Sequence, residues 1–267
     1  MPDRIQIDTP EALGTILNER LASYLSDPRN SVVKQLFAAW TELGWKAYIF
    51  GGMLRDVTLF ANKANPRDID IVVSNKSLNQ LKRHFSKYIL RETRFGGLHI
   101  QIADIKFDIW PLQQTWAFGN TLKLSPKAIN LPRTTFLNVE GIVAELPNFR
   151  TESKVFEYGF IKAINSRELD INLTENPYPA LSAIRSIITA RKLKFKLSIA
   201  LRKYILHAVE SEGLDALVDA QLKHYSTIIL KKDALRKEVS KLGEADHTPQ
   251  IPRQFDELAG QSAKIER

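Results

Sequence analysis

The amino-acid sequence predicts an α+β fold, in which a small mixed or antiparallel β-sheet with flanking helices is followed by an all-helical region. Three observations lead to this prediction. Short segments between residues 46 and 110 alternate apolar and polar residues, as half-buried strands do. Helical segments precede them, and from about residue 174 apolar residues recur at helical spacing. A chain of 267 residues is long enough for one large domain or two smaller ones.

The composition is that of an ordinary globular protein. Hydrophobic residues make up 44% of the chain and charged residues 25%. No apolar run approaches the roughly 20 residues of a membrane helix, and the N-terminus lacks a signal-peptide layout, so we expect a cytoplasmic protein without membrane contact. The absence of cysteine excludes disulfides, thiol catalysis and thiolate-bound zinc. The formal net charge of +8 favours a polyanionic partner, either nucleic acid or nucleotide.

The N-terminal part of the sequence predicts two helices. The first covers residues 9–25, where Thr9 can cap the N-terminus, Pro10 suits the first turn and leucines recur at helical spacing. The segment DPRN interrupts the pattern, and a second helix follows from Ser31 to a stop signal at Gly44. A short strand, KAYIF, then enters a pair of glycines, after which MLRDVTLFA predicts another helix.

The middle of the sequence predicts most of the sheet. Residues 68–73, DIDIVV, alternate with a period of two, and residues 77–88 form an amphipathic helix. The segments LHIQIA and IKFDIW follow, and they predict a hairpin that turns near Ala103 and Asp104. Residues 120–172 have a mixed pattern that is mostly β.

The C-terminal part predicts helices in PYPALSAIRSIITARKL, SIALRKYILHAVES, GLDALVDAQL and a Lys/Arg-rich segment near residues 226–241. Residues 243–267 combine prolines and charges with little periodicity, which predicts a flexible tail. We therefore divide the chain into a first domain, 1–172, which includes the helices at 9–43, a basic helical domain, 173–242, and the tail.

Three aspartates form the main candidate site. Alternation puts Asp68 and Asp70 on one face of a strand, where two carboxylates so close would repel each other. A divalent cation between them removes this repulsion, and Mg²⁺ or Mn²⁺ prefers such oxygen ligands. Asp108 lies on the polar face of the second hairpin strand, whereas Asp104 is a poorer candidate because aspartates in turns usually bind backbone. We predict that Asp68, Asp70 and Asp108 are catalytic and bind metal.

The glycine pair that precedes these acids suits phosphate binding. A strand, then Gly51 and Gly52, then a helix start leave backbone N–H groups free and no side chain in the way. Arg55 and Arg67 lie nearby, either as contacts for a triphosphate or as partners of the aspartate that follows each of them. Each feature alone has a structural alternative, a solvated strand face or an ordinary turn, but their order and spacing together favour a nucleotide site.

The segment GGMLRD…RDIDIVV resembles the GGxVRDxxLG…DxDxVV signature of the polymerase-β-like nucleotidyltransferases, in particular of tRNA CCA-adding enzymes and class II bacterial poly(A) polymerases. Three further segments are similar to that family: RFGGLHIQIADIKFDIWPLQQTW, RTTFLNVE and ENPYPALSAIRSIITARKLKF. The resemblance covers roughly residues 45–200. It implies a nucleotidyltransferase head, a helical neck and a truncated helical body.

The resemblance also implies the reaction and the residues that take part in it. An acceptor hydroxyl would attack the α-phosphate of an NTP, with release of pyrophosphate. The nucleotide-binding residues, from the resemblance and from the glycine argument above, are Gly51, Gly52, Arg55, Arg133, Asn138 and Arg185. The Asp and Arg with which the family reads a base are Asn176 and Pro179 here, so the sequence does not indicate which NTP is used.

We expect the acceptor to be the 3′ end of tRNA or of another RNA. No acidic residue lies between Glu175 and Glu210, and basic residues there fall near one helix face. The candidate RNA-binding residues are Arg191, Lys192, Lys196 and Lys203. Two alternatives stay open: a nucleotidyltransferase that modifies a protein partner or a small molecule in a bacterial defence or toxin–antitoxin system, and a non-catalytic nucleotide-binding regulator. The five histidines show no metal-ligand spacing and are expected to be structural.

Overall fold

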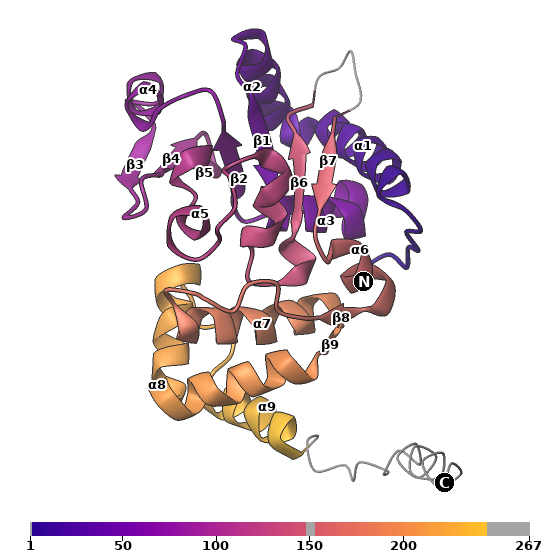
Figure 1. The fold of residues 1–267 in the computed structure, drawn as a ribbon, viewed down its shortest axis with the longest axis vertical. Coiled ribbons are helices and arrows are strands. Elements are labelled where there is room, and N and C mark those ends of the chain that lie inside the picture. Colours follow the sequence, from indigo (N-terminus) through magenta and orange to yellow (C-terminus); the bar gives the residue numbers. More distant parts are fainter. Residues whose placement is uncertain (1, 148–152, 245–267) are drawn as a thin grey trace, which may run out of the picture.

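A computed structural model describes residues 2–147 and 153–244 of the chain. Its helices are α1 (Pro10–Ser26), α2 (Ser31–Glu42), α3 (Gly52–Phe60), α4 (Leu78–His84), α5 (Trp116–Asn120), α6 (Phe160–Ser166), α7 (Pro179–Leu193), α8 (Ile199–Tyr225) and α9 (Lys232–Glu244). Its strands are β1 (Ala47–Phe50), β2 (Ile69–Val73), β3 (Ile89–Glu92), β4 (Leu98–Ile102), β5 (Ile105–Pro111), β6 (Ile142–Glu145), β7 (Val155–Glu157), β8 (Glu168–Leu169) and β9 (Lys196–Leu197). Figure 1 shows a sheet with its helices above a layer formed by α7, α8 and α9.

The main sheet has seven strands in the order β3-β4-β5-β2-β1-β6-β7. Its neighbouring strands are antiparallel except for β2 and β5, which are parallel. Parallel neighbours need a crossover connection, and here the chain passes through α4, β3 and β4 before it returns to β5. The predicted α+β fold, with a mixed sheet, flanking helices and a helical region after it, is confirmed.

One face of the sheet is covered by the N-terminal helices and α4. Apolar residues alternate along β2 and β5, so that Ile69, Ile71 and Phe107 are buried on this face. Trp40 of α2 is 1% exposed, stacks on Trp45 at 5.5 Å and meets the ring edge of Phe107 at 5.8 Å. This aromatic packing leaves the opposite face of β2 and β5 for the polar residues of the site.

The predicted N-terminal elements and the hairpin are confirmed. Thr9 caps α1 by accepting a hydrogen bond from the Ala12 N–H, and Gly44 takes the left-handed conformation after α2, with φ +68°. Ala103 also has a positive φ, of 52°, at the turn between β4 and β5. These positions were predictable because caps and turns depend on local sequence.

The structure corrects the prediction of mostly β structure between residues 120 and 172. β6 and β7 are short, and much of the rest consists of 3₁₀ turns, Ala128–Thr134 and Asn138–Glu140, and of α6. Gly159, with φ +73°, ends the extended segment and starts α6, so the pattern KVFEYGFIKAI holds both a strand and a helix. The edge strand β3 was not predicted, because most of its residues are exposed and carry no apolar alternation.

The helices of the C-terminal part pack mainly on one another and on the underside of the sheet region. α8 departs from helical geometry at Gly213, whose φ and ψ are 81° and 161°, so its second half turns back toward the sheet (Figure 1). β9 pairs with β8 in a two-stranded ribbon, a small departure from an all-helical neck. The division into domains at residues 172 and 173 stays a prediction, and the expected tail lies almost wholly outside the described residues. In residues 2–147 and 153–244, no helix has both the length and the hydropathy of a bilayer-spanning segment.

Candidate active site

Two of the three predicted aspartates lie side by side. The parallel register of β2 and β5 pairs Asp70 with Asp108. His99 of β4 is the partner of Asp108 on the other side, and Arg91 of β3 is the partner of His99. Residues in register project from the same face of a sheet, so these four side chains form a row across four strands. The register therefore puts Asp70 and Asp108 on the same face of neighbouring strands, as the alternation predicts.

The glycine turn lies beside this row. Gly51 follows β1 with φ +69° and ψ −124°, a backbone conformation in which a side chain would be strained. A Cβ atom on Gly51 would lie 3.9 Å from Oδ2 of Asp70. α3 begins at Gly52, and the first N–H groups of a helix have no partner within it. The structure thus brings together the helix start and the carboxylate that the sequence predicts for triphosphate and metal.

Asp68 is paired with its neighbour in sequence, Arg67. It precedes β2, and its Oδ2 accepts hydrogen bonds from Nη2 of Arg67 at 2.5 Å and from Nε at 3.1 Å. Arg67 also donates to the His224 carbonyl oxygen at 3.1 Å and lies over the Tyr225 ring, 5.1 Å from its centre. Arg67 was predicted either to contact a triphosphate or to pair with Asp68, and in the structure it pairs with Asp68. Its other contacts are with the last residues of α8.

The electrostatics around Asp70 favour the approach of a cation. Burial, and then the nearby charge of Asp68, raise the pKa of Asp70 from 3.8 to about 7, against the opposing effect of Arg185. An ionised Asp70 is therefore unfavourable in the folded chain unless a positive charge approaches it. The donor set, carboxylate oxygens only, is the type that Mg²⁺ and Mn²⁺ prefer.

No three Asp, Glu or His side chains in the described parts of the chain are grouped closely enough to hold a metal ion together. Asp70 and Asp108 are adjacent, while Asp68 is bound to Arg67, so a three-carboxylate site requires Asp68 to release that arginine. Metal binding by Asp68, Asp70 and Asp108 stays a prediction.

Two predicted nucleotide-binding arginines converge on one carboxylate that the sequence analysis did not select. Glu140 accepts hydrogen bonds from Nη2 of Arg185 at 2.9 and 3.0 Å and from Nη1 of Arg55 at 3.1 Å. Arg55 also binds Asp56 through Nε at 2.9 Å, as the alternative for this residue predicted. Lys192 of α7 donates to the other oxygen of Asp56 at 2.7 Å. These contacts join α3 to α7.

The other two residues predicted to contact the nucleotide, Asn138 and Arg133, have no side-chain contact with this cluster among those that the structure describes. Asn138 is buried, its Oδ1 accepts from the N–H groups of Val139 and Asp170, and its Nδ2 donates to the Glu168 carbonyl. Its amide therefore holds backbone in this structure. The guanidinium of Arg133 lies over the Tyr158 ring at 4.6 Å. Neither arrangement tests a nucleotide contact, which stays a prediction for both residues.

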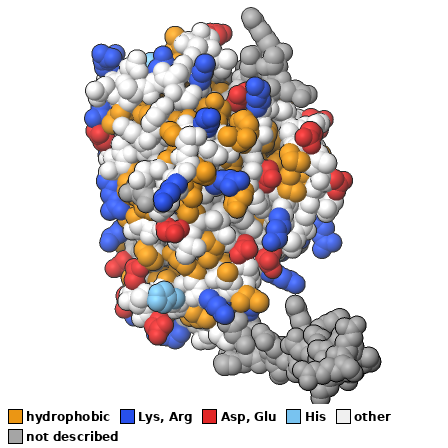
Figure 2. All heavy atoms as spheres, in the orientation of Figure 1, with side chains coloured by type: hydrophobic (Ala, Val, Ile, Leu, Met, Phe, Trp, Pro, Cys, Tyr) orange, Lys and Arg blue, Asp and Glu red, His pale blue; other side chains and the backbone are white. Residues whose placement is uncertain are grey.

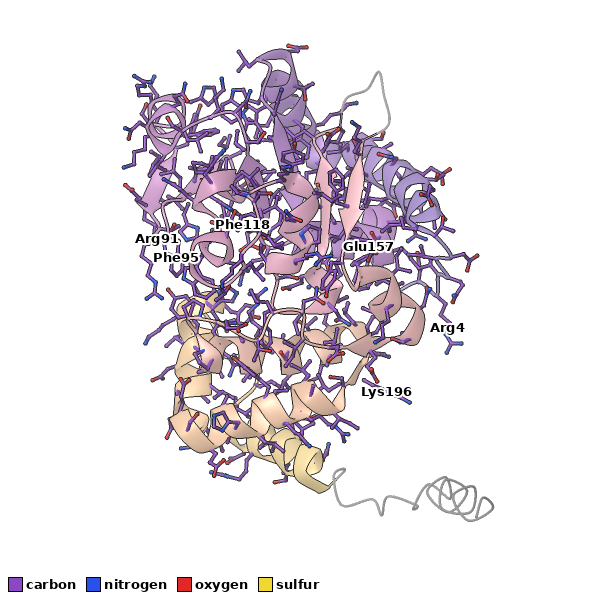
Figure 3. The ribbon with its side chains drawn as sticks, viewed as in Figure 1. Arg4, Arg91, Phe95, Phe118, Glu157 and Lys196 are labelled. Atoms are coloured by element: carbon purple, nitrogen blue, oxygen red, sulfur yellow. The ribbon has the colours of Figure 1, made fainter. Side chains whose placement is uncertain are left out.

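A cavity of about 1080 Å³ lies between the acid-bearing face of the sheet and the helices below it. Asp70, Asp108 and His99 line it together with an aromatic group. In that group Phe95 lies 6.3 Å from Trp116 and 6.2 Å from Tyr178 between ring centres, and Arg94 lies over the rings of Phe95 and Tyr178. Figure 3 shows Arg91 and Phe95, which both line this cavity, at the β3 edge of the molecule. Its size and polar ends suit a nucleotide.

Two histidines line this cavity, while the expectation that the histidines are structural stays a prediction. Nδ1 of His99 contacts Oδ1 of Asp108, and His224 lines the cavity. The signal for His99 was present in the predicted hairpin, because His99 precedes the turn by as many residues as Asp108 follows it. No local signal marks His224 or Glu140, which the fold brings in from distant segments.

The comparisons bear on the fold. No family model matches the chain, and no curated protein matches it. A CCA-adding enzyme solved with ATP is 16% identical, with a TM-score of 0.58 over 87% of this chain and 55% of that one. The Thermotoga maritima CCA-adding enzyme in complex with tRNA is 18% identical, with a TM-score of 0.55 over 88% of this chain and 54% of that one.

A tRNA nucleotidyltransferase solved with a primer tRNA and an incoming ATP analogue is 19% identical, with a TM-score of 0.54 over 80% of this chain and 63% of that one. The chain thus spans between half and two thirds of the length of these structures. At these identities the likeness shows a shared fold, which confirms the resemblance drawn from the sequence motifs.

Proposed function

We propose that the protein is a metal-dependent nucleotidyltransferase that transfers a nucleoside monophosphate from an NTP to an acceptor hydroxyl, with the 3′ end of a tRNA or another RNA as acceptor. The observation that carries the proposal is the register of Asp70 with Asp108 beside the Gly51 turn. The fold shared with tRNA nucleotidyltransferases supports it. A cytoplasmic location is part of the same proposal.

In this reaction the protein holds positively charged and N–H groups against the phosphates of the NTP, and carboxylates against the metal ion. The N-terminus of α3 binds triphosphate oxygens through backbone N–H groups, and Arg185 faces the phosphates from α7. Asp70 and Asp108, with Asp68 once it is free of Arg67, hold Mg²⁺ or Mn²⁺, which when bound supplies charge neutralisation and lowers the pKa of the acceptor hydroxyl. The acceptor oxygen bonds to the α-phosphorus, the bond to the bridging oxygen breaks, and pyrophosphate leaves.

The RNA assignment rests on the basic helical region. Arg191 and Lys196 line a second hollow of about 540 Å³ beside β9, and Lys203 is exposed on α8. Lys192 instead pairs with Asp56, so it contributes less to such a surface. On the face drawn in Figure 2, Lys and Arg side chains are spread out with acidic ones between them, and the candidate surface that we propose is the region around β9.

A direct test uses labelled NTPs, each with Mg²⁺ and either total RNA or cell protein. We expect wild-type protein to label RNA, and we expect Asp70→Ala and Asp108→Ala to abolish labelling. Asp104→Ala is the matched control, because Asp104 is exposed at the turn of the same hairpin. Wild-type rates in either of the first two variants, or no product with any NTP, would contradict the proposal.

A second acceptor class, a protein or small molecule, is favoured by two observations. Asn176, at one base-reading position, accepts from the Tyr178 N–H at 2.8 Å and its amide nitrogen contacts Oγ of Ser182, so it is engaged in the start of α7. Glu212 and Asp219 of α8 line the cavity and would repel a polyanion. Label in protein or in a small product would support this class, and NTP binding without turnover would support a non-catalytic regulator.

A further inference from the structure

We propose that Glu140 is a positioning residue that fixes Arg185 of α7 beside the phosphate-binding turn, so that the helical region supplies a cation to the nucleotide triphosphate. The inference rests on the proposed nucleotidyltransferase function. It adds a residue that lies outside the glycine and aspartate motifs, 70 residues after Asp70 in the sequence.

Glu140 is built into the frame of the site. It ends the 3₁₀ turn Asn138–Glu140, immediately before Gly141 and β6, and it is 8% exposed. Both of its carboxylate oxygens accept from Nη2 of Arg185, and Oε1 also accepts from Nη1 of Arg55. A buried carboxylate bonded to two guanidinium groups is fixed in position, and it fixes them in turn.

Arg55 lies against the glycine turn, and Glu140, which binds Arg185, borders it. A Cβ atom on Gly52 would lie 3.6 Å from Nη2 of Arg55, and one on Gly51 would lie 3.9 Å from the backbone oxygen of Glu140. The turn is therefore flanked by Arg55 on one side and by Glu140 and Asp70 on the other. A phosphate bound at the start of α3 would lie among these groups.

The two arginines differ in access to a ligand. The side chain of Arg55 is 9% exposed and binds two carboxylates, Asp56 in α3 and Glu140 in the 3₁₀ turn, whereas that of Arg185 is 37% exposed. Both contacts of Arg185 with Glu140 use Nη2, which leaves Nε and Nη1 for another oxygen ligand. Arg185 is thus the member of the pair that a triphosphate can reach.

Charge explains why a carboxylate is needed at this position. Arg55, Arg185 and Lys192 bring three positive charges to the junction, and Asp56 and Glu140 bring two negative ones. Burial would raise the pKa of Glu140, but Arg185 and Arg55 together lower it below its ordinary value, so the carboxylate stays ionised. Without Glu140 the two guanidinium groups would repel each other and Arg185 would turn to solvent. One positive charge in excess remains to face the ligand.

The test measures binding without turnover. Equilibrium binding of ATP with Ca²⁺, and of inorganic tripolyphosphate, is measured by calorimetry for the full chain and for the isosteric variant Glu140→Gln. We expect Kd for both ligands to rise by about 10-fold or more, because a charge-assisted contact is lost from the phosphates. Arg185→Gln should give the same rise, and the double variant should be no worse than Arg185→Gln alone.

The matched control is Asp170→Asn. Asp170 is another partly buried carboxylate that joins the sheet region to the helices, since it accepts from Oγ of Ser198 at 2.6 Å. We expect this variant to lower the melting temperature and to leave Kd within about 3-fold of wild type. If Glu140→Gln does not fold, Arg185→Lys provides the second variant: it loses the fork of donors at a partly exposed site and should raise Kd at an unchanged melting temperature.

The outcomes distinguish a failure of the positioning role of Glu140 from a failure of the proposed nucleotidyltransferase function. Additive effects in the double variant, an unchanged Kd in Glu140→Gln, or a Kd raised equally in Asp170→Asn would each overturn the positioning role while leaving the nucleotide site in place. A wild-type chain that binds neither ATP nor tripolyphosphate would overturn the proposed function itself.

Discussion

Replacing Asp70 by asparagine should stabilise the metal-free protein at alkaline pH. Burial and the charge of Asp68 raise the pKa of Asp70 from 3.8 to about 7, so the folded chain holds a proton that the unfolded chain has already lost. A tenfold change in an ionisation constant corresponds to about 1.4 kcal/mol. Ionising Asp70 in the folded protein therefore costs up to about 4 kcal/mol, and part of this cost is relieved by local relaxation.

The sign of the pH dependence follows from proton counts. Between pH 3.8 and about 7 the folded state binds more protons at this position than the unfolded state, so wild-type stability falls as the pH rises through this window. The cost is complete above pH 7 and absent well below 3.8. Asparagine cannot ionise, so the advantage of Asp70→Asn should be about 2 to 4 kcal/mol at pH 8 and should shrink toward zero at pH 4.

The assay is urea unfolding followed by tryptophan fluorescence, in EDTA, at several pH values from 4 to 8.5. Trp40 and Trp45 lie in the core beneath β5 and report on its loss. Added Mn²⁺ should then stabilise the wild type but not Asp70→Asn, by about 2.7 kcal/mol at a concentration 100 times Kd. A variant that is no more stable than wild type at pH 8, or a difference that does not change with pH, would refute the reasoning.

Three further predictions concern packing and RNA. Gly141→Ala should cost at least about 3 kcal/mol in urea unfolding, because its Cβ would lie 2.3 Å from the Tyr158 carbonyl oxygen in the β6–β7 pair; a loss below 1 kcal/mol, about the ordinary effect of a point mutation, would contradict this. Trp40→Ala should cost about 3 to 5 kcal/mol in the same assay, since it removes a ring that packs on Trp45, Phe85 and Phe107. Removing the charges of Lys196 and Lys203 together should weaken RNA binding and reduce the salt slope of log Kd by about 1 to 2, whereas an unchanged slope would remove both residues from the RNA surface.

The parts of the fold that the sequence predicted correctly depend on neighbours along the chain. The cap at Thr9, the turn at Ala103 and the glycines at the start of α3 each act within a few residues. The failures arise where distant segments decide. β3 forms because β4 offers it a partner, although Leu90 and Arg91 on β3 are exposed and carry no strand pattern.

The site shows the same division. Asp70 and Asp108 could be chosen because alternation placed each on a polar strand face, and their register then followed from the parallel pairing of β2 with β5. Glu140 could not be chosen, because a single acid in NVEGIV has no meaning until α3 and α7 bring their arginines to it. For Asp68 the alternation in DIDIVV could be recognised from the sequence. The contact of Arg67 with the end of α8 could not, because those residues are far apart in the chain.

The break at Gly213 determines how far the helical layer reaches. A straight helix of 27 residues would extend about 40 Å and would carry its last turn past the molecule, far from the strands. Instead, the helix changes direction at Gly213. A Cβ atom on Gly213 would meet no other atom within 4 Å. Asp219, Lys223 and His224, beyond this break, line the cavity beside Asp70 and Asp108, so the conformation of Gly213 decides where that wall of the cavity lies.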